Sequence, residues 1–494
     1  MRATRGVSLV QMLAAGGIAV LGGCGAVAVA PAAVAMVQMI PASTGHIVVD
    51  ADAASPPTTA DCEATYGIAC YEPYQIRGAY DLAPLYAHGI KGQGSTIVIV
   101  DAFGSPTIRE DLAIFDRAFN LPPPPSFQVL QPEGPVPSCG ADPFGASDCF
   151  GWGTETSLDV EWAHVMAPEA NIVLLETPTS ETEGVQGFPD IVAAENWAID
   201  NHIGDVITQS FGATEQTFPS AGAIYGLRSA YINAAAHGVT VLAASGDDGA
   251  SDELSNLTCC YAQRAIDWPS SDPLVTGVGG TQLFVNAAGD QTSPAVVWND
   301  SSTTIGIPGP AYTWGAGGGG HSVVFSRPAF QDGVAGVVGD SRGTPDIAMS
   351  AAVNGAVDFY QSTDWYYVNG VRTKFPGGWS IVGGTSEASP LFSGIVALTD
   401  QVAGHSIGYL NPTLYALAEQ GGDNGIVPIT KGNNTFTFCT TYDPTTGACT
   451  STPITVPGFY ANGHYNDATG WGTVDAAQFV PALAREAATP TPSS

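Results

Sequence analysis

Four short apolar runs that alternate with helix-like segments constrain the fold of this chain more than any other feature of its sequence. The runs are rich in Val, Ile and Leu and cover residues 96–100, 172–175, 206–210 and 239–243. They are apolar on both faces of the pleat, which is typical of parallel strands covered by helices on each side. The pattern predicts an α/β fold with a mostly parallel central sheet and helices on both of its faces.

The 494 residues show no internal repeat and no clear boundary between residues 73 and 482, which predicts one large domain over that range. A hydrophobic share of 45% together with 60 Gly and 36 Pro indicates a buried core threaded by many turns, and it excludes a wholly disordered chain. We interpret residues 36–72 as a linker and residues 483–494 as a flexible tail.

The charge balance excludes polyanionic partners. The chain has 14 Lys+Arg against 46 Asp+Glu, which gives a formal net charge of -32 at pH 7. This charge repels nucleic acid and anionic lipid, so we expect neither as a partner and treat the protein as a monomer. An excess of carboxyl groups is best tolerated where some of them are protonated, which favours acidic surroundings.

The first 35 residues resemble a secretory signal peptide. Arg2 and Arg5 precede a long apolar stretch, and no further Asp, Glu, Lys or Arg occurs before Asp50. We expect cleavage after Ala35 and a secreted or extracellular protein. Two alternatives are a lipobox that ends at Cys24 and an uncleaved N-terminal segment, and either would anchor the protein to a membrane.

Eight cysteines besides Cys24 fit an oxidising compartment. Three pairs lie close enough in sequence to form local disulfide loops: Cys62 with Cys70, Cys139 with Cys149, and Cys439 with Cys449. We assign no disulfide partner to the adjacent Cys259 and Cys260. Because no Cys-x2-Cys pair with matching His spacing is present, we expect no zinc site.

Polar or Gly-rich residues follow three of the apolar runs at their carboxyl ends. Asp101 ends the first run, residues 210–212 (Ser-Phe-Gly) follow the third, and residues 245–249 (Ser-Gly-Asp-Asp-Gly) follow the fourth. Open α/β sheets bind their ligands at the carboxyl ends of the strands. We therefore expect these three segments to converge on one site.

Ser386 is a candidate nucleophile. It follows Gly383, Gly384 and Thr385 and precedes an apolar helix-like run at 391–398. Glycines let the backbone turn tightly and approach a substrate, and the amino end of a helix places the serine hydroxyl in a positive local field. An isolated Gly-Thr-Ser is also a common helix N-cap, so the motif alone does not assign the chemistry.

No histidine is well placed to act as the base that a serine nucleophile usually needs. Of the eight histidines, His164 is the best candidate. It lies in the run Glu-Trp-Ala-His-Val-Met, without the glycines and threonine expected around a catalytic histidine. We interpret it as a packed or solvent-exposed residue.

Carboxyl groups offer another base. Glu155 and Asp159 are four residues apart, which places them on one face of a predicted helix. An ordinary solvated acidic face is the simpler interpretation, but two close carboxyls also titrate as a coupled pair that shares one proton below neutral pH. Asp247 is either a turn aspartate or, when protonated, a hydrogen-bond donor to a developing oxyanion. The shared proton of the Glu155–Asp159 pair and the protonated form of Asp247 both require acid pH.

The order of these motifs along the chain resembles that of the sedolisins, which are serine-carboxyl peptidases with a subtilisin-like fold. The matching motifs are Glu155-x-x-x-Asp159, Asp247 and Gly384-Thr385-Ser386-x-x-x-Pro390, supported by residues 269–273, 317–320 and 343–346. The resemblance covers most of residues 73–475. It implies a subtilisin-like α/β fold and a peptidase domain over residues 73–482.

The resemblance also implies roles for individual residues. Four would carry the chemistry: Ser386 as nucleophile, Glu155 as general base and acid, Asp159 as the group that orients Glu155, and Asp247 as the oxyanion donor. Three would pair with the substrate backbone as an added strand: Ser210, Phe211 and Gly212. Three more would support the site: Asp101, Gly384 and Thr385.

Two departures from the family pattern carry expectations of their own. Pro428 and Asn466 stand where the family has the carboxylates of a calcium site. A hard cation held mainly by neutral oxygens binds weakly, so we expect no calcium and no other cofactor. Between Ala35 and the first core strand there are too few residues for the separately folded prodomain of the family, so we expect a variant without one.

A secreted, acid-acting serine-type endopeptidase fits these features together. It would cleave protein or peptide substrates through an acyl-enzyme on Ser386. A glycosidase that uses Glu155 and Asp159 is one alternative, but side chains one helical turn apart are poorly placed to flank a sugar ring. A noncatalytic binding module that keeps the fold is the other alternative.

Overall fold

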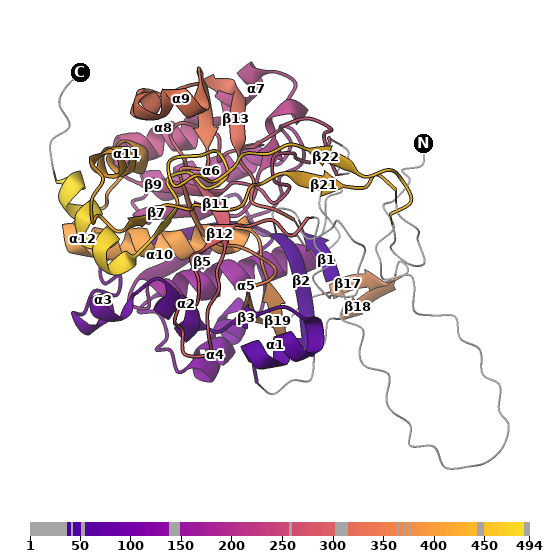
Figure 1. Ribbon diagram of the computed structural model, residues 1–494. Coiled ribbons are helices and arrows are strands. Elements are labelled where there is room, and N and C mark those ends of the chain that lie inside the picture. The colour runs from indigo at the N-terminus through magenta and orange to yellow at the C-terminus, as the bar shows by residue number, and fades with distance from the viewer. Residues whose placement is uncertain are drawn as a thin grey trace, which may run out of the picture.

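The computed structural model shows a central sheet between layers of helices (Figure 1). It describes residues 37–40, 43–50, 55–137, 149–255, 259–301, 315–362, 365–368, 371–374, 377–441 and 449–488. The strands of the central sheet are β4 (Thr96–Ala102), β5 (Phe127–Leu130), β6 (Asn171–Thr177), β7 (Val206–Gln209), β9 (Thr240–Ala244), β11 (Thr276–Gln282), β12 (Val296–Val297) and β15 (Ile347–Ser350).

The central sheet is mostly parallel, as its apolar runs predict. Its order is β12-β11-β9-β7-β4-β6-β5, and β15 pairs with β11. Only β12 is antiparallel to its neighbour in this sheet, whereas the other pairings are parallel. The four runs correspond to β4, β6, β7 and β9, so the predicted α/β fold class is confirmed.

Helices cover both faces of this sheet. Because side chains alternate along a strand, Ile97 and Ile99 of β4 pack on one face with α5 (Cys149–Met166) and α10 (Thr385–Ala403). Val98 and Val100 point to the other face, where α6 (Phe188–Asp200) and α8 (Ser229–His237) lie. In Figure 1 the strands lie between these two pairs of helices. Burial on both faces explains why the runs are apolar throughout.

The range interpreted above as a linker contains regular structure, which corrects that boundary. Strand β2 (Ser43–Asp50) pairs with β19 (Gly378–Val382), and β3 (Cys70–Tyr71) pairs with β16 (Ala356–Gln361). A disulfide between Cys62 and Cys70 ties α1 (Thr59–Tyr66) to β3. Local polarity suggested a linker, whereas partners some 300 residues away in the chain make this segment part of a second sheet, β1-β2-β19-β16-β3.

The remaining elements surround this frame. The further helices are α2 (Pro73–Ala79), α3 (Ala83–Ala87), α4 (Ile108–Phe119), α7 (Ala221–Leu227), α9 (Ala335–Val338), α11 (Leu410–Gln420), α12 (Ala476–Ala487) and the 3-10 turns η2 (Glu215–Thr217) and η3 (Ala329–Val334). The further strands are β1 (Val37–Ile40), β8 (Ala213–Thr214), β10 (Asp267–Trp268), β13 (Gly320–Ser326), β14 (Ser341–Thr344), β17 (Trp365–Val368), β18 (Val371–Lys374), β20 (Ile426–Val427), β21 (Phe436–Phe438), β22 (Ile454–Val456) and β23 (Thr473–Val474). Helix α12 continues to Ala487, so the segment predicted as a flexible tail from residue 483 begins as helix.

Two of the predicted local disulfides are present, Cys62–Cys70 and Cys439–Cys449. The predicted Cys139–Cys149 pair involves Cys139, which lies outside the described residues, as does the signal-like segment 1–35. Within the part of the chain that the structure describes, we find no helix of the length and hydrophobicity needed to span a membrane.

Candidate active site

Two glycines set the position of Ser386 in the first turn of α10. The Gly384 N–H donates to the Ala351 carbonyl, just after β15, at 2.7 Å. A Cβ at Gly383 would lie only 2.8 Å from the same carbonyl oxygen, closer than real Cβ contacts. Gly384 has a φ of 144°. The glycines therefore let the start of α10 pack against the carboxyl end of β15.

Hydrogen bonds join Ser386 to the end of β7 and to α5. The Ser386 hydroxyl donates to the Ser210 carbonyl at 3.4 Å, and the Ser210 hydroxyl lies 3.3 Å from the Ser386 carbonyl. The Ser210 hydroxyl also donates to Asp159 Oδ1 at 2.9 Å. A serine predicted to bind substrate thus links the candidate nucleophile to a carboxyl of the predicted pair.

The carboxyls of α5 are buried rather than solvated. Glu155 and Asp159 are 1% and 0% exposed, which contradicts the simpler interpretation of an acidic surface face. Burial raises the pKa of Asp159 well above its usual range, and the negative charges of Asp101 and Glu155 raise it further, while the Ser210 hydrogen bond lowers it. Asp159 therefore holds a proton at acid pH.

Asp247 is anchored at the start of α10. Its Oδ1 accepts hydrogen bonds from the Thr385 N–H at 2.7 Å and from the Thr385 hydroxyl at 2.8 Å. The segment at residues 316–318 holds the loop that carries Asp247. The Ala316 N–H donates to the Asp247 carbonyl and the Gly318 N–H to the Gly246 carbonyl, each at 2.7 Å. Thr385 was predicted as a supporting residue. Because it directly precedes Ser386 in α10, its two hydrogen bonds hold Asp247 near the candidate nucleophile.

The predicted substrate-binding segment leads out of β7 towards β8. Phe211 is buried, and its ring lies 6.3 Å from those of Trp152 and Phe188. Gly212 faces Asp267, and a Cβ there would lie 3.0 Å from the Asp267 Cβ. Packing of Phe211 therefore fixes this segment beside Ser210, while Gly212 leaves room for the strand β10 that carries Asp267.

His164 has a structural role away from Ser386. It is fully buried near the carboxyl end of α5, where its Nε2 lies 2.8 Å from the Pro122 carbonyl and 3.3 Å from Asp116 Oδ1. The packed alternative for His164 is therefore confirmed. Ser386 instead contacts the Ser210 hydroxyl, which also contacts Asp159.

The chain is similar in sequence to known serine-carboxyl peptidases, although no family model matches it. Kumamolisin from Bacillus sp. (strain MN-32) is 30% identical over 372 residues, which is 74% of this chain and 57% of kumamolisin. Human tripeptidyl-peptidase 1 is 29% identical over 336 residues, 65% of this chain and 50% of that protein. The chain spans about half the length of the curated relatives it matches.

The fold agrees with the sequence. A solved structure of Pseudomonas sedolisin, described as a serine-carboxyl proteinase complexed with two molecules of pseudo-iodotyrostatin, superposes with a TM-score of 0.64 at 25% identity. The match covers 84% of this chain and 97% of the solved one. The chain belongs to the sedolisin family. The family resemblance and the subtilisin-like fold class expected from the sequence are thereby confirmed.

Two buried carboxyls next to predicted site residues were not predicted from the sequence. Glu387 directly follows Ser386, is fully buried, and has a pKa raised well above its usual range, chiefly by burial. Glu176 ends the β6 run beside Asp101. The signal for Glu176 was available, because alternation along β6 places it on the same face as Ile172 and Leu174.

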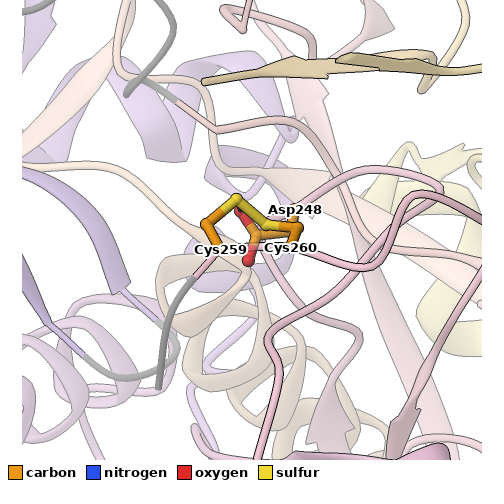
Figure 2. Close-up of side chains that lie close together, drawn as sticks. All are labelled: Asp248, Cys259 and Cys260. Carbon is orange, nitrogen blue, oxygen red and sulfur yellow. Dashed lines mark hydrogen bonds between the residues drawn. A yellow bond between two sulfur atoms is a disulfide. The ribbon is translucent and has the colours of Figure 1, made fainter. Parts of the chain in front are cut away.

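The adjacent Cys259 and Cys260 form a disulfide with each other, a pairing that the sequence left open. Figure 2 shows this disulfide beside the Asp248 carboxyl, which follows Asp247 in the chain. Among the described residues these three form the one group of His, Cys, Asp or Glu side chains close enough to share a metal ion. With the two sulfur atoms bonded to each other, neither sulfur is a thiolate ligand for a metal ion.

Two backbone carbonyls near Pro428 and Asn466, the positions discussed above for calcium, accept hydrogen bonds from protein donors. The Ile429 carbonyl accepts from the Gly463 N–H at 2.9 Å. The Asn466 amide donates through Nδ2 to the His464 carbonyl at 3.0 Å, so an amide N–H stands where the family would have a carboxylate. Asp467, one residue further on, contacts His321 Nε2 through Oδ2 at 2.9 Å.

Proposed function

We propose that this protein is a secreted serine-carboxyl endopeptidase that hydrolyses protein or peptide substrates at acid pH. The observation that carries the proposal is the hydrogen-bonded link from Ser386 through Ser210 to the buried Asp159, in a family of serine-carboxyl peptidases. Secretion is supported by the signal-like N-terminal sequence and the disulfides.

In the proposed mechanism Glu155 takes the proton of the Ser386 hydroxyl as it attacks the substrate carbonyl. Asp159 orients Glu155 and keeps its own proton, because burial and the nearby charge of Glu155 raise the pKa of Asp159. Asp159 Oδ1 already accepts from Ser210, whereas Oδ2 has no hydrogen-bond partner among the described residues and is the oxygen available to Glu155. Glu155 then returns the proton to the leaving amine, which yields the acyl-enzyme on Ser386.

Asp247 is the proposed donor to the oxyanion that forms in this step. Thr385 holds Asp247 Oδ1 through two hydrogen bonds, which orients the carboxyl beside the nucleophile. A protonated carboxyl donates a hydrogen bond to the oxyanion, whereas an ionised one repels it. Activity therefore depends on Asp247 keeping its proton, which restricts turnover to acid pH.

A comparison of two variants at Asp247 tests this function. We expect Asp247→Asn to retain measurable turnover and to extend it to higher pH, because its amide donates at every pH while its Oδ1 still accepts from Thr385. Asp247→Ala should lower kcat by about 100-fold or more, the usual effect of losing an oxyanion donor. The measurement is a pH-rate profile on a mixed peptide library.

Equal losses in Asp247→Asn and Asp247→Ala, with both variants folded, would remove Asp247 from the oxyanion site. Absence of cleavage by the wild-type protein at every acid pH would instead favour the noncatalytic binding module. The thermal unfolding midpoint of each variant serves as the folding control.

We also propose that the protein needs no calcium. Support comes from the engaged Ile429 and His464 carbonyls and from Asn466, which brings no negative charge to a hard cation. We expect dialysis against EGTA to change the unfolding midpoint by less than about 2 °C, well under the shift that losing a structural ion would cause. Calcium retained at stoichiometric amounts by elemental analysis would contradict this expectation.

A further inference from the structure

Glu215 is a buried glutamate that lies three residues after the predicted substrate-binding segment 210–212. Its carboxyl accepts three hydrogen bonds. Oε1 accepts from the Ser271 hydroxyl at 2.7 Å and from the Ser322 hydroxyl at 2.6 Å. Oε2 accepts from the Val323 N–H at 2.7 Å. Both oxygens of this carboxyl, which is 3% exposed, are therefore engaged as acceptors.

The surroundings of Ser322 fix the direction of its hydrogen bond to Glu215. The Ser322 Oγ accepts from the N–H groups of Val324 at 3.0 Å and of Phe325 at 2.8 Å, so its own hydrogen is left to donate to Glu215. Burial raises the pKa of Glu215, while the hydrogen bonds that it accepts lower it. A protonated carboxyl keeps its carbonyl oxygen as an acceptor, so the two bonds to Oε1 do not depend on the charge of Glu215.

Three segments that are distant in sequence meet at Glu215. Glu215 directly follows β8, which pairs antiparallel with β10. Ser271 belongs to the loop after β10, and Ser322 belongs to β13. Because one carboxyl accepts from both serines, it ties the end of β8 to β13 as well as to the loop after β10. Strand β8 is two residues long, so its own backbone pairing offers few hydrogen bonds to hold it in place.

The segment 210–212 is consequently held at both of its ends. At one end the Ser210 hydroxyl donates to Asp159 at 2.9 Å. At the other end the chain runs through β8 into Glu215. A peptide that pairs with this segment as an added strand binds best to a backbone that is already fixed, because ordering the backbone on binding would weaken the affinity.

We propose that Glu215 is a positioning residue for substrate binding, which holds the segment 210–212 in the place where a bound peptide pairs with it. This inference rests on the proposed function. Glu215 acts through β8 and β13, whereas Ser386 and Asp247 are positioned at the start of α10. The chemical step should therefore not depend on Glu215.

Loss of this anchor should weaken peptide binding and leave the chemical step nearly intact. We expect Glu215→Ala to raise KM by about fivefold or more while kcat stays within about threefold of the wild type, as for an interaction that is equal in the ground state and the transition state. Glu215→Gln keeps an oxygen that accepts from both serine hydroxyls, so its KM should lie much closer to that of the wild type. Initial rates of cleavage of an internally quenched peptide at acid pH measure both constants.

Asp400→Ala is the matched control for Glu215→Ala. Asp400 is also buried, at 4% exposure, and it also accepts from a serine hydroxyl and a backbone N–H, those of Ser95 and Ile407. It lies near the opposite end of α10 from Ser386. Asp400→Ala should lose stability without a change in KM. The thermal unfolding midpoint of each variant shows whether it is folded at the assay temperature.

A second readout follows binding without cleavage. In the Ser386→Ala background, Glu215→Ala should weaken the binding of the same peptide, followed by fluorescence anisotropy, by a factor similar to the rise in KM. Cleavage that persists in Ser386→Ala would contradict the proposed function, whereas the peptide affinities would still test the role of Glu215.

An unchanged KM and an unchanged peptide affinity in folded Glu215→Ala would overturn the inference, and so would an equal rise of KM in Asp400→Ala. If Glu215→Ala does not fold, Ser271→Ala decides, because it removes one donor and keeps the Glu215 carboxyl. We expect Ser271→Ala to raise KM by about twofold at an unchanged kcat. A wild-type KM in Ser271→Ala would then refute the role of Glu215.

Discussion

Ser386→Ala is expected to lower kcat for peptide cleavage by about 10⁴-fold or more, the usual loss when the nucleophile of a serine peptidase is removed. Without the hydroxyl no acyl-enzyme forms, and the carboxyl network has no proton to accept. The fold should be unaffected, because the hydrogen bond from the Ser386 hydroxyl to the Ser210 carbonyl is long, at 3.4 Å, and alanine fits the same helical position. Turnover of internally quenched peptides at acid pH measures the loss.

Ser389→Ala is the matched control for this prediction. Ser389 is a buried serine of the same helix, one turn further along, and its hydroxyl lies 2.8 Å from that of Thr208. It is outside the proposed chemistry, so we expect its turnover to stay within about threefold of the wild type while its stability falls slightly. Comparable activity in Ser386→Ala and the wild type would refute the acyl-enzyme mechanism.

The free energy of unfolding is expected to be highest at acid pH and to fall steeply towards neutral pH. Many buried carboxyls have raised pKa values in the folded protein, with burial as the first cause. Examples are Asp300 (about 6), Glu253 (about 7), Glu195 (about 8) and Asp400 (about 8). A raised carboxyl pKa means that the folded state binds more protons than the unfolded state above about pH 4. The stabilisation from each such carboxyl is therefore fully present below its pKa in the unfolded chain. It is lost as the pH rises to its pKa in the folded protein.

The size of this effect is large relative to the stability of a typical domain. Between about pH 5 and pH 7, Glu195 and Asp400 should each contribute a loss of roughly 3 kcal/mol, at about 1.4 kcal/mol per pH unit. Their sum, roughly 6 kcal/mol, already lies within the 5–15 kcal/mol that folded domains usually have. Urea unfolding followed at several pH values between about 4 and 8 measures the slope.

Glu195→Gln separates this cause from other effects of pH. The amide has the shape of the carboxyl but no charge, so the variant should lose roughly 3 kcal/mol less than the wild type between about pH 5 and pH 7. A wild-type stability that is flat or rising over this range would show that the buried carboxyls do not control it. An acid-stable fold with a net charge of -32 at pH 7 agrees with the acid activity proposed above.

Much of the candidate site was readable from local patterns. The spacing of Glu155 and Asp159 is one helical turn, and the structure places both in α5. Glycines before Ser386 predicted a tight turn into a helix, and α10 begins at Thr385. Asp101 and Asp247 follow strand runs, so a parallel sheet brings them to one edge.

Other features depend on pairings between residues far apart in the chain. Residues 43–50 look like a polar linker by themselves and become β2 only because β19 offers an edge to pair with. The link from Ser210 to Asp159 and the hydrogen bonds of Glu215 to β13 arise where two or three elements meet. The local sequence around each residue does not show which distant residues contact it in the folded protein.

The sequence by itself determined the strand and helix pattern and the family, because periodicity and motif spacing are properties of consecutive residues. Only the tertiary structure decided how the carboxyls of the site are arranged. It set the register of β4 against β6, which places Glu176 next to Asp101, and it buried Asp159 out of water. The pKa of a carboxyl depends on burial and on charges nearby in space, and neither is fixed before the chain has folded.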